Sequence, residues 1–408
     1  GRQVKDETGE SHKKTSRSKK FNTIATCGRN WVKVTQRFHN LDFLRAFAMT
    51  MGLFIHAPIL FATPVLAKEL QIENIAQPED WVWLLFIFIS NWRMPLFFLL
   101  SGFFAVLVIE KKGCSYFIKD RFIRIGVTCL LFSAFYDMLD GRFDFTTGHL
   151  WFLYKLMIFV LCFSLLYETK VFKDIVCRTI SPKIFYIISL WLIATAPLVH
   201  ILNNSLHPDA MFASETFFSL KPGLLVYYFS YFLMGVLLYS NQQIFSKLSE
   251  NKTITILGIL SVLAYFAQLY AGSLLFSGVE DVRNIQNTQF DPILILFFAF
   301  TKGINTILWC LFFIGLASKF ILSDSAILRW FVELSYPIYI LHLIPLIIIS
   351  ATLYVYGTGL SQIGNFSLTI IIGFIVCVNL YYIFIKFTPL NWLINGYHKS
   401  FLQLKFKR

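Results

Sequence analysis

Long apolar segments recur along this chain of 408 residues, and each is long enough to cross a bilayer as a helix. Inside a membrane every backbone polar group must be paired within the protein, which a helix achieves by itself. The segments predict an all-α polytopic membrane protein with ten transmembrane helices. They lie at residues 43–66, 82–109, 122–139, 151–167, 184–200, 223–240, 253–275, 292–318, 330–355 and 365–387.

Composition excludes a water-soluble protein. Hydrophobic residues make up 56% of the chain and charged residues only 14%, so a soluble fold would have to hide an implausible amount of apolar surface. The net charge of +13 could suggest a nucleic-acid partner, but the basic residues gather in the tails and in alternate loops. The expected partner is the lipid bilayer and not nucleic acid.

Loop charge tests the number of spans independently. The connections 67–81, 137–149 and 276–291 are poor in Lys and Arg, whereas 110–124 and 168–183 are rich in both. Cytoplasmic loops carry an excess of basic residues, and an even number of spans with both ends inside satisfies this rule throughout. The N- and C-termini are therefore predicted to be cytoplasmic.

The pattern divides the chain into three parts. Residues 1–40 hold ten Lys or Arg against three acids and predict a disordered tail on anionic lipid, followed by a membrane domain, 41–387, and a basic tail, 388–408. No apolar core precedes a cleavage site, so the N-terminal part is not predicted to be a secretory signal. Seven Cys without a CxxC pair predict neither a disulfide framework nor a metal site.

The first span carries an unusual polar stripe. Arg45 and His56 are eleven positions apart and fall about 20° apart around a helix, with Asp42 and Gly52 close to the same stripe. His56 would lie about 16 Å deeper than Arg45. A snorkelling Arg and a packed His would explain the pair, but ionisable groups at membrane depth are more often functional.

Other basic residues are predicted at the same depth. Arg93, Lys302 and His342 fall about halfway along the second, eighth and ninth spans, and the acids lie at span ends. An unpaired Arg at the bilayer centre costs at least ~2.5 kcal/mol, so Arg93 should face the bundle interior, water or an anion. The sequence predicts a shared cavity that prefers anions, with Lys302 included for its depth alone.

The second span and the loop after it hold further candidates. Ser101 and Gly102 are expected to serve close helix packing, and Ser101 is not expected to be a nucleophile. Lys119, Arg121 and Arg124 form a basic run beside the third span. The run is either membrane anchoring or a site for the phosphates of a nucleotide-like donor.

Four segments in this order and spacing resemble the acyltransferase 3 family, whose integral-membrane members acylate sugars. They read LDFLRAFAMTMGLFIHA from residue 41, WRMPLFFLLSGFFAVL with FIKDRFIRIGV, HLWFL at 149–153 and SYPIYILHLIPL at 335–346. Within the family the chain is most similar to the glucans biosynthesis protein C branch. That branch often carries two adjacent His where this chain has only His342.

The resemblance implies acyl transfer from cytoplasmic acyl-CoA, with no permanently bound cofactor, at the inner membrane of a bacterium. In the glucan branch the donor would be succinyl-CoA and the acceptor a periplasmic glucan. The family's Arg and His of the first span fall on Arg45 and His56, and its second-span Arg falls on Arg93. Arg45 would then face the CoA phosphates, with Lys119, Arg121 and Arg124 as further candidates.

The chemistry suits these residue types. A sugar hydroxyl is a poor nucleophile, and a His can take its proton at neutral pH. We assign His56 as general base and Arg93 as stabiliser of the thioester oxyanion, and an acyl-His56 intermediate is an alternative. Asp42 either orients Arg45 or simply lies at the interface.

Three outer or midplane residues are candidates for the acceptor site. His149 and Trp151 begin the fourth span, where aromatic rings either stack on a sugar or form an interfacial belt. His342 either contacts the acceptor or packs in the bundle. Tyr336 and Tyr339 are expected to pack only.

Several alternatives remain open on sequence alone. An anion transporter or channel would also use midplane basic residues, and a regulatory protein could keep an inactive scaffold. The donor could be succinyl-CoA or acetyl-CoA, and the acceptor a glucan, another envelope polysaccharide or a lipid-linked sugar. The sequence does not indicate an oligomeric state. Metal, ATP and Ser-hydrolase motifs are absent from the sequence.

Overall fold

The structure is a computed structural model, and it describes residues 38–62, 72, 77–139, 141, 147–169, 172–173, 182–211, 216–218, 220–279, 288–356 and 359–396. The described chain is predominantly helical and has no β-strand within these ranges. This agrees with the predicted all-α class. Residues 1–37 of the predicted N-terminal tail and the last twelve residues lie outside the described part, and residues 39–40 of that tail already belong to the first helix.

Seven helical segments are long and apolar enough to cross a membrane. An eighth span would be a bent pair, α14 (Ala326–Leu341) and α15 (Leu343–Val355), whose axes meet at 69°. The seven are α4 (Asp80–Lys112), α5 to α6 (Cys114–Leu139), η2 with α7 (Gly148–Glu168), α10 (Pro222–Ser240), α12 (Asn251–Leu275), α13 (Pro292–Phe320) and α16 with η5 (Gln362–Lys386).

The remaining two predicted spans, 43–66 and 184–200, contain helices, but these helices are not both long and apolar enough to count as clear membrane spans. α1 covers His39–His56, and Asp42, Arg45 and His56 lower its mean hydropathy. A four-residue helix, α2 (Ile59–Ala62), follows it. In α9 (Pro182–Leu202) the apolar part is shorter, at Ile187–Leu202. The structure supports a multi-pass membrane protein with seven or eight clear spans, and the count of ten stays a prediction.

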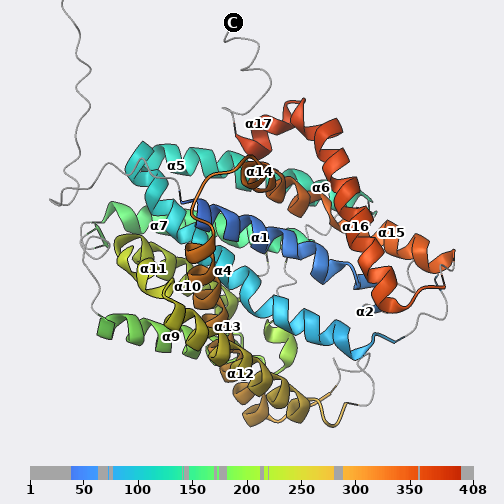
Figure 1. Ribbon diagram of the computed structural model, residues 1–408, viewed down its shortest axis with the longest axis horizontal. Coiled ribbons are helices and arrows are strands. Elements are labelled where there is room, and N and C mark those ends of the chain that lie inside the picture. The colour runs from blue at the N-terminus through green and yellow to red at the C-terminus, as the bar shows by residue number, and fades with distance from the viewer. Residues whose placement is uncertain are drawn as a thin grey trace, which may run out of the picture. The chain divides into compact units, whose positions relative to one another are not determined.

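α4 is the helix around which the others gather (Figure 1). In α4, 83% of an apolar stretch of 18 residues is buried inside the protein, whereas in α12 the corresponding share is 17%. α4 is apolar on all sides, which is the pattern of a helix enclosed by other helices. It contacts α1, α10 and α13, so residues on α4 can reach both the N-terminal helix and the middle of the chain.

Two glycines let α4 and α10 cross closely. A Cβ on Gly102 would lie 1.9 Å from the carbonyl oxygen of Phe232, and a Cβ on Gly235 would lie 1.7 Å from that of Leu99. Small residues at membrane helix crossings allow such backbone contact. The expected packing role of Gly102 is confirmed.

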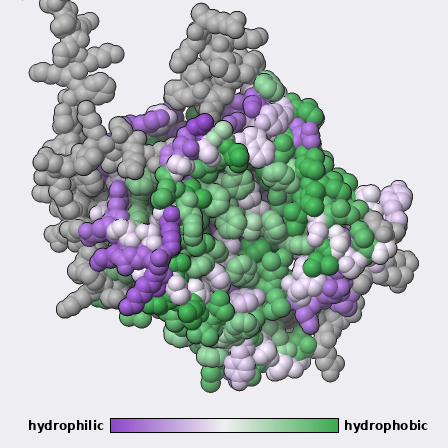
Figure 2. Space-filling model, in the orientation of Figure 1, coloured by the Kyte–Doolittle hydropathy of each residue, from purple (hydrophilic) through white to green (hydrophobic). Residues whose placement is uncertain are grey.

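The outer surface is apolar over a broad area, as the green atoms in Figure 2 show. Large side chains such as Leu165, Leu190 and Ile383 are more than 60% exposed. In water such a surface would be costly, but in a bilayer it is the surface that contacts lipid.

Part of the predicted C-terminal tail is folded. α17 (Leu390–Asn395) follows the last span, and the backbone carbonyl of Ile394 accepts a hydrogen bond from Nε of Arg124 at 3.3 Å. The chain therefore returns to the helix that carries Arg124 before the described part ends at residue 396.

Candidate functional site

Three histidines and one arginine meet inside the bundle, and we call them the histidine centre. They are His56, Arg93, His149 and His342. The ring centroids of His56 and His342 lie 5.2 Å apart, and those of His149 and His342 lie 5.5 Å apart. His56 ends α1, Arg93 lies within α4, His149 lies in the turn η2 (Gly148–Leu150), and His342 lies between α14 and α15. Segments nearly 300 residues apart therefore build one site.

The break between α14 and α15 positions His342. Pro337 and Pro345 flank the break, and Pro345 has no N–H with which to continue the helical ladder. Beside the break, the backbone carbonyl of Ile340 accepts hydrogen bonds from the hydroxyl of Tyr136 at 2.6 Å and from Nε2 of His149 at 3.3 Å. This carbonyl therefore holds two side chains from other segments against the break.

These contacts define the protonation of two rings. Nδ1 of His342 lies 2.7 Å from the carbonyl oxygen of Tyr339, and only an N–H can bond there. Nδ1 therefore carries a proton, and in the neutral ring Nε2 of His342 is an acceptor. By the same argument Nε2 of His149 donates to Ile340, so Nδ1 of His149 is its acceptor.

Two polar atoms in the centre have no partner among the described residues. They are Nη1 of Arg93 and Nε2 of His342, both buried. A Cβ placed on Gly52 of α1 would lie 3.5 Å from the first atom and 3.2 Å from the second. A donor and an acceptor thus approach the same point beside α1, so closely that a side-chain carbon at residue 52 would contact both.

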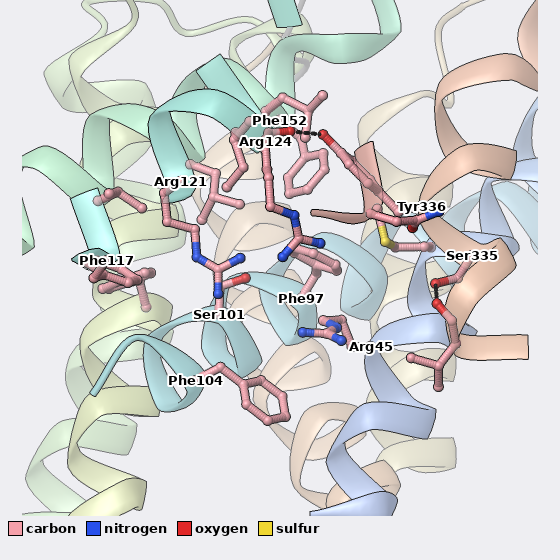
Figure 3. A pocket seen from close by; sticks show the side chains of 18 of the residues that line it. Arg45, Phe97, Ser101, Phe104, Phe117, Arg121, Arg124, Phe152, Ser335 and Tyr336 are labelled. Atoms are coloured by element: carbon pink, nitrogen blue, oxygen red, sulfur yellow. Dashed lines mark hydrogen bonds between the residues drawn. The ribbon is translucent and has the colours of Figure 1, made fainter. Parts of the chain in front are cut away.

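A pocket opens near the other end of α1. Figure 3 shows the guanidinium groups of Arg45, Arg121 and Arg124 pointing into it. Phe97, Ser101 and Phe104 of α4 form one wall. The remaining lining side chains are Met49, Phe117, Ile125, Phe152, Leu153, Leu156, Val160, Phe232, Val332, Glu333, Ser335, Tyr336 and Asn395. We call this space the arginine pocket.

Each of the three arginines has neighbours that hold it. Nη2 of Arg45 lies 3.2 Å from Oδ1 of Asp42, and its guanidinium lies 5.0 Å from the ring centre of Phe104. This contact agrees with the orienting role considered for Asp42. Asp120 lies 4.0 Å from Nε of Arg121 and 3.8 Å from Nη1 of Arg124. One carboxylate thus faces two cations.

The arginine pocket and the histidine centre lie on the same helix faces. α1 carries Arg45, Met49, Gly52 and His56 at spacings of four, three and four residues, which place them on one side of the helix. On α4 the same side carries Arg93 in the centre and Phe97, Ser101 and Phe104 in the pocket. Arg45 and His56 are about 16 Å apart along α1. The two regions are the polar ends of one face that α1 and α4 share, with Met49 and Phe97 between them.

Some predicted residues lie away from both regions. Lys119 is exposed and is not among the side chains that line the arginine pocket. Trp151 packs against Tyr228 at 5.4 Å between ring centres, and its ring also receives the ammonium of Lys155 at 4.9 Å. Lys302 of α13 interacts electrostatically with His200 of α9. The predicted grouping of Lys302 with His56, Arg93 and His342 is therefore wrong, because α13 turns this side chain toward α9.

The sequence analysis missed several contributors. Tyr336 and Tyr339 do more than pack, because the Tyr336 hydroxyl donates to the carbonyl of Arg124 at 2.7 Å and the Tyr339 hydroxyl donates to that of His149 at 2.5 Å. Ser101, expected to serve packing, lines the arginine pocket, as does Glu333, whose carboxylate accepts from Tyr381 at 2.5 Å. The sequence did contain a signal for the two tyrosines. Tyr336 and Tyr339 precede His342 by about two turns and one turn, so all three lie on the same side of a helix. Among the described residues, no His, Cys, Asp or Glu group is arranged to hold a metal ion.

The comparisons with known proteins agree with this geometry. Residues 38–383 match the family model described as an acyltransferase domain. Similar curated proteins include glucans biosynthesis protein C of Escherichia coli O1:K1 / APEC, O139:H28 (strain E24377A / ETEC) and O9:H4 (strain HS). Each is 30% identical over 95 residues, which is 23% of this chain and 23% of the relative.

The aligned region thus spans about a quarter of those relatives' length. No solved structure matches the chain. The family match, by contrast, runs from the start of α1 into η5 (Tyr381–Lys386) and includes the histidine centre and all of the arginine pocket except Asn395. The chain therefore belongs to the acyltransferase 3 family of membrane acyltransferases.

Proposed function

We propose that this membrane acyltransferase moves an acyl group from cytoplasmic acyl-CoA to a hydroxyl of a periplasmic or envelope glucan. The observation that carries the proposal is the shared helix face that joins an arginine-lined pocket to a centre of three histidines and Arg93. Acyl transfer from CoA needs an anion site for the phosphates and, at the end of a long arm, groups that activate a thioester. The shared face offers both in the required order.

The arginine pocket would bind the donor. Arginine presents paired N–H groups that match phosphate oxygens, and three of them give the pocket an affinity for a nucleotide that carries several phosphates. The aromatic side chains Phe97, Phe104 and Phe152 give the pocket an apolar wall. The pantetheine arm would then run along α1 past Met49 toward Gly52.

The histidine centre would carry the chemistry. Attack of the acceptor hydroxyl on the thioester forms a tetrahedral oxyanion, which Arg93 stabilises. His56 accepts the hydroxyl proton, CoA leaves as the thiolate, and that proton then neutralises it. The ring of His342 lies close to that of His56, so a hydroxyl held between them can reach either. Attack by His56 itself, through an acyl-His56 intermediate, is the alternative route.

The acceptor assignment rests on the relatives. The matched Escherichia coli proteins are named for glucan biosynthesis. By that likeness we propose a glucan as acceptor, succinyl-CoA as donor and the bacterial inner membrane as location, with ten spans and cytoplasmic termini. His149 would contact the glucan, because its ring lies beside that of His342 and its Nδ1 can accept a hydrogen bond from a sugar hydroxyl. Trp151 would act only at the periphery of that site.

The test is CoA release by the full chain in nanodiscs, supplied with succinyl-CoA or acetyl-CoA, with and without a periplasmic glucan fraction. Release that requires glucan establishes the reaction and identifies the donor. His56→Ala should abolish it and keep acyl-CoA binding. The matched control is His200→Ala, because His200 is a buried histidine outside the centre, on α9.

A carrier for anions is the second candidate, since buried basic groups within a membrane would serve it too. A carrier would move a labelled anion into liposomes without cleaving any thioester. If the folded protein transports the labelled anion but releases no CoA, the protein is a carrier and the acyltransfer proposal is wrong.

A further inference from the structure

His342 differs from the other histidines of the centre in one respect. Its Nδ1 is held by the carbonyl of Tyr339, with the Ile338 carbonyl 3.2 Å away as a second neighbour, and its Nε2 is buried without a partner in the described structure. The side chain is 0% exposed. Leaving a buried acceptor atom unpaired is destabilising, and at His342, unlike at His200, an unpaired buried donor lies close to it.

The complementary atom lies nearby. Nη1 of Arg93 is also unpaired among the described residues, and the Arg93 side chain is 6% exposed. Both atoms lie within 3.5 Å of the point where a Cβ on Gly52 would start. A reacting group above Gly52 would meet an N–H that can bind an oxyanion and a lone pair that can accept a proton.

The position along α1 also agrees. Gly52 lies one turn from His56 on the side toward Arg45, so a donor entering from the arginine pocket reaches Gly52 first. At His56 itself, by contrast, none of the described contacts fixes a tautomer. The bend at α14 and α15 does so for His342 by supplying the Tyr339 carbonyl.

We propose that His342 is the general base of the reaction: its Nε2 takes the proton of the acceptor hydroxyl above Gly52, while Nη1 of Arg93 binds the thioester oxygen. The hydroxyl oxygen forms the bond to the acyl carbon, the C–S bond breaks, and the imidazolium of His342 returns the proton to the CoA thiolate. His56 then contacts the acceptor from the far side. This inference rests on the proposed acyl transfer and changes only which histidine carries the proton.

The experiment compares two substitutions of His342 that separate basicity from hydrogen bonding. His342→Asn keeps an N–H able to reach the Tyr339 carbonyl and removes the Nε2 atom. His342→Gln can place an acceptor oxygen near the position of Nε2, but an amide does not take a proton at neutral pH. His200→Gln is the matched control, because His200 is buried with Nδ1 3.1 Å from the Ser205 carbonyl and an unpaired Nε2, outside the centre.

Both His342 variants should lower kcat about 100-fold or more, the contribution typical of a general base, with KM for acyl-CoA within about twofold. Their residual rate should rise with pH as hydroxide replaces the base, which a merely structural role would not cause. The control should keep wild-type turnover. Gly52→Ala, which leaves His342 intact and fills the space, should also lower kcat and provides the test if both variants fail to fold.

Turnover of His342→Gln within a few fold of wild type would overturn the assignment, as would an unchanged pH profile in the slow variants. If His56→Ala is inactive and His342→Gln active, only this inference fails and His56 is the base. If the wild-type chain releases no CoA from any donor, the proposed function fails with it.

Discussion

Nε2 of His342 lies 3.2 Å from the point at which a side chain on Gly52 would begin. Residue 52 therefore decides whether a substrate can reach the unpaired atoms of His342 and Arg93. In the helix interior, replacing Gly by Ala normally stabilises by about 0.5–1 kcal/mol, because glycine loses more backbone freedom on folding. At Gly52 the crowding of His342 opposes that gain, so activity should respond more strongly than stability at this position.

We predict that Gly52→Ala lowers turnover at least about tenfold, a loss equivalent to about 1.4 kcal/mol, while the thermal midpoint changes little. Gly272→Ala on α12 is the matched control, since its Cβ would meet only the side chain of Phe298 at 3.4 Å. Turnover and the unfolding midpoint are measured on both. Full activity in Gly52→Ala would show that the reacting groups meet elsewhere.

The arginine pocket gives a second prediction. Replacing Arg45 or Arg121 by Ala should raise KM for acyl-CoA about tenfold or more, because each charge-assisted hydrogen bond contributes about 1.5–3 kcal/mol. Lys119→Ala removes the same charge from the same basic run but from an exposed position outside the pocket. It should change KM less than about twofold.

Equal effects of Arg121→Ala and Lys119→Ala would mean that the basic run acts through general attraction, and the phosphates would then bind outside the pocket. Steady-state kinetics at two salt concentrations separate these cases, since salt screens general attraction more than a direct contact.

The sequence predicted which residues share one helix face better than it predicted which distant segments meet at the site. The stripe of Arg45, Gly52 and His56 follows from helix geometry alone and is present in α1. The apolar runs likewise predicted the helices of the bundle. Both depend on local periodicity, which the chain carries segment by segment.

What the sequence did not reveal depends on distant contacts. The convergence of His149 and His342, and the role of the Tyr339 carbonyl, arise where α14 bends and the turn before α7 meets it. Depth within a span does not determine which way a side chain points, and Lys302 was misplaced for that reason. Asp120 and Glu333 resembled ordinary charges at span ends until the fold placed them at the arginine pocket.

A third prediction concerns the crossing of α4 and α10. Gly235→Ala would place Cβ 1.7 Å from the carbonyl oxygen of Leu99, which is backbone and cannot rotate away. We expect a loss of stability above about 4 kcal/mol or failure to fold, since overpacking at a fixed backbone contact exceeds the usual 1–3 kcal/mol. The measurement is the yield of monodisperse protein in detergent. Normal yield and midpoint would mean that the two helices cross farther apart.

The last prediction concerns a buried amide network that lies apart from the proposed chemistry. Oε1 of Gln268 on α12 accepts from the amides of Asn91 on α4 and Asn305 on α13, both at 2.7 Å. Polar side chains between membrane helices contribute about 0.6–2 kcal/mol each. Gln268→Leu should therefore lower the free energy of unfolding by about 1–3 kcal/mol, because two amides lose their acceptor.

The same substitution should leave KM for acyl-CoA unchanged, since none of the three amide side chains lines the arginine pocket. Gln243→Leu, in the short helix α11 (Gln243–Leu248), is the control for loss of an amide outside the network. Unfolding is followed by chemical denaturation in mild detergent. Asn91 lies only two residues before Arg93 on α4, so a fall in kcat with unchanged stability would reveal that this network positions Arg93 as well as joining three helices.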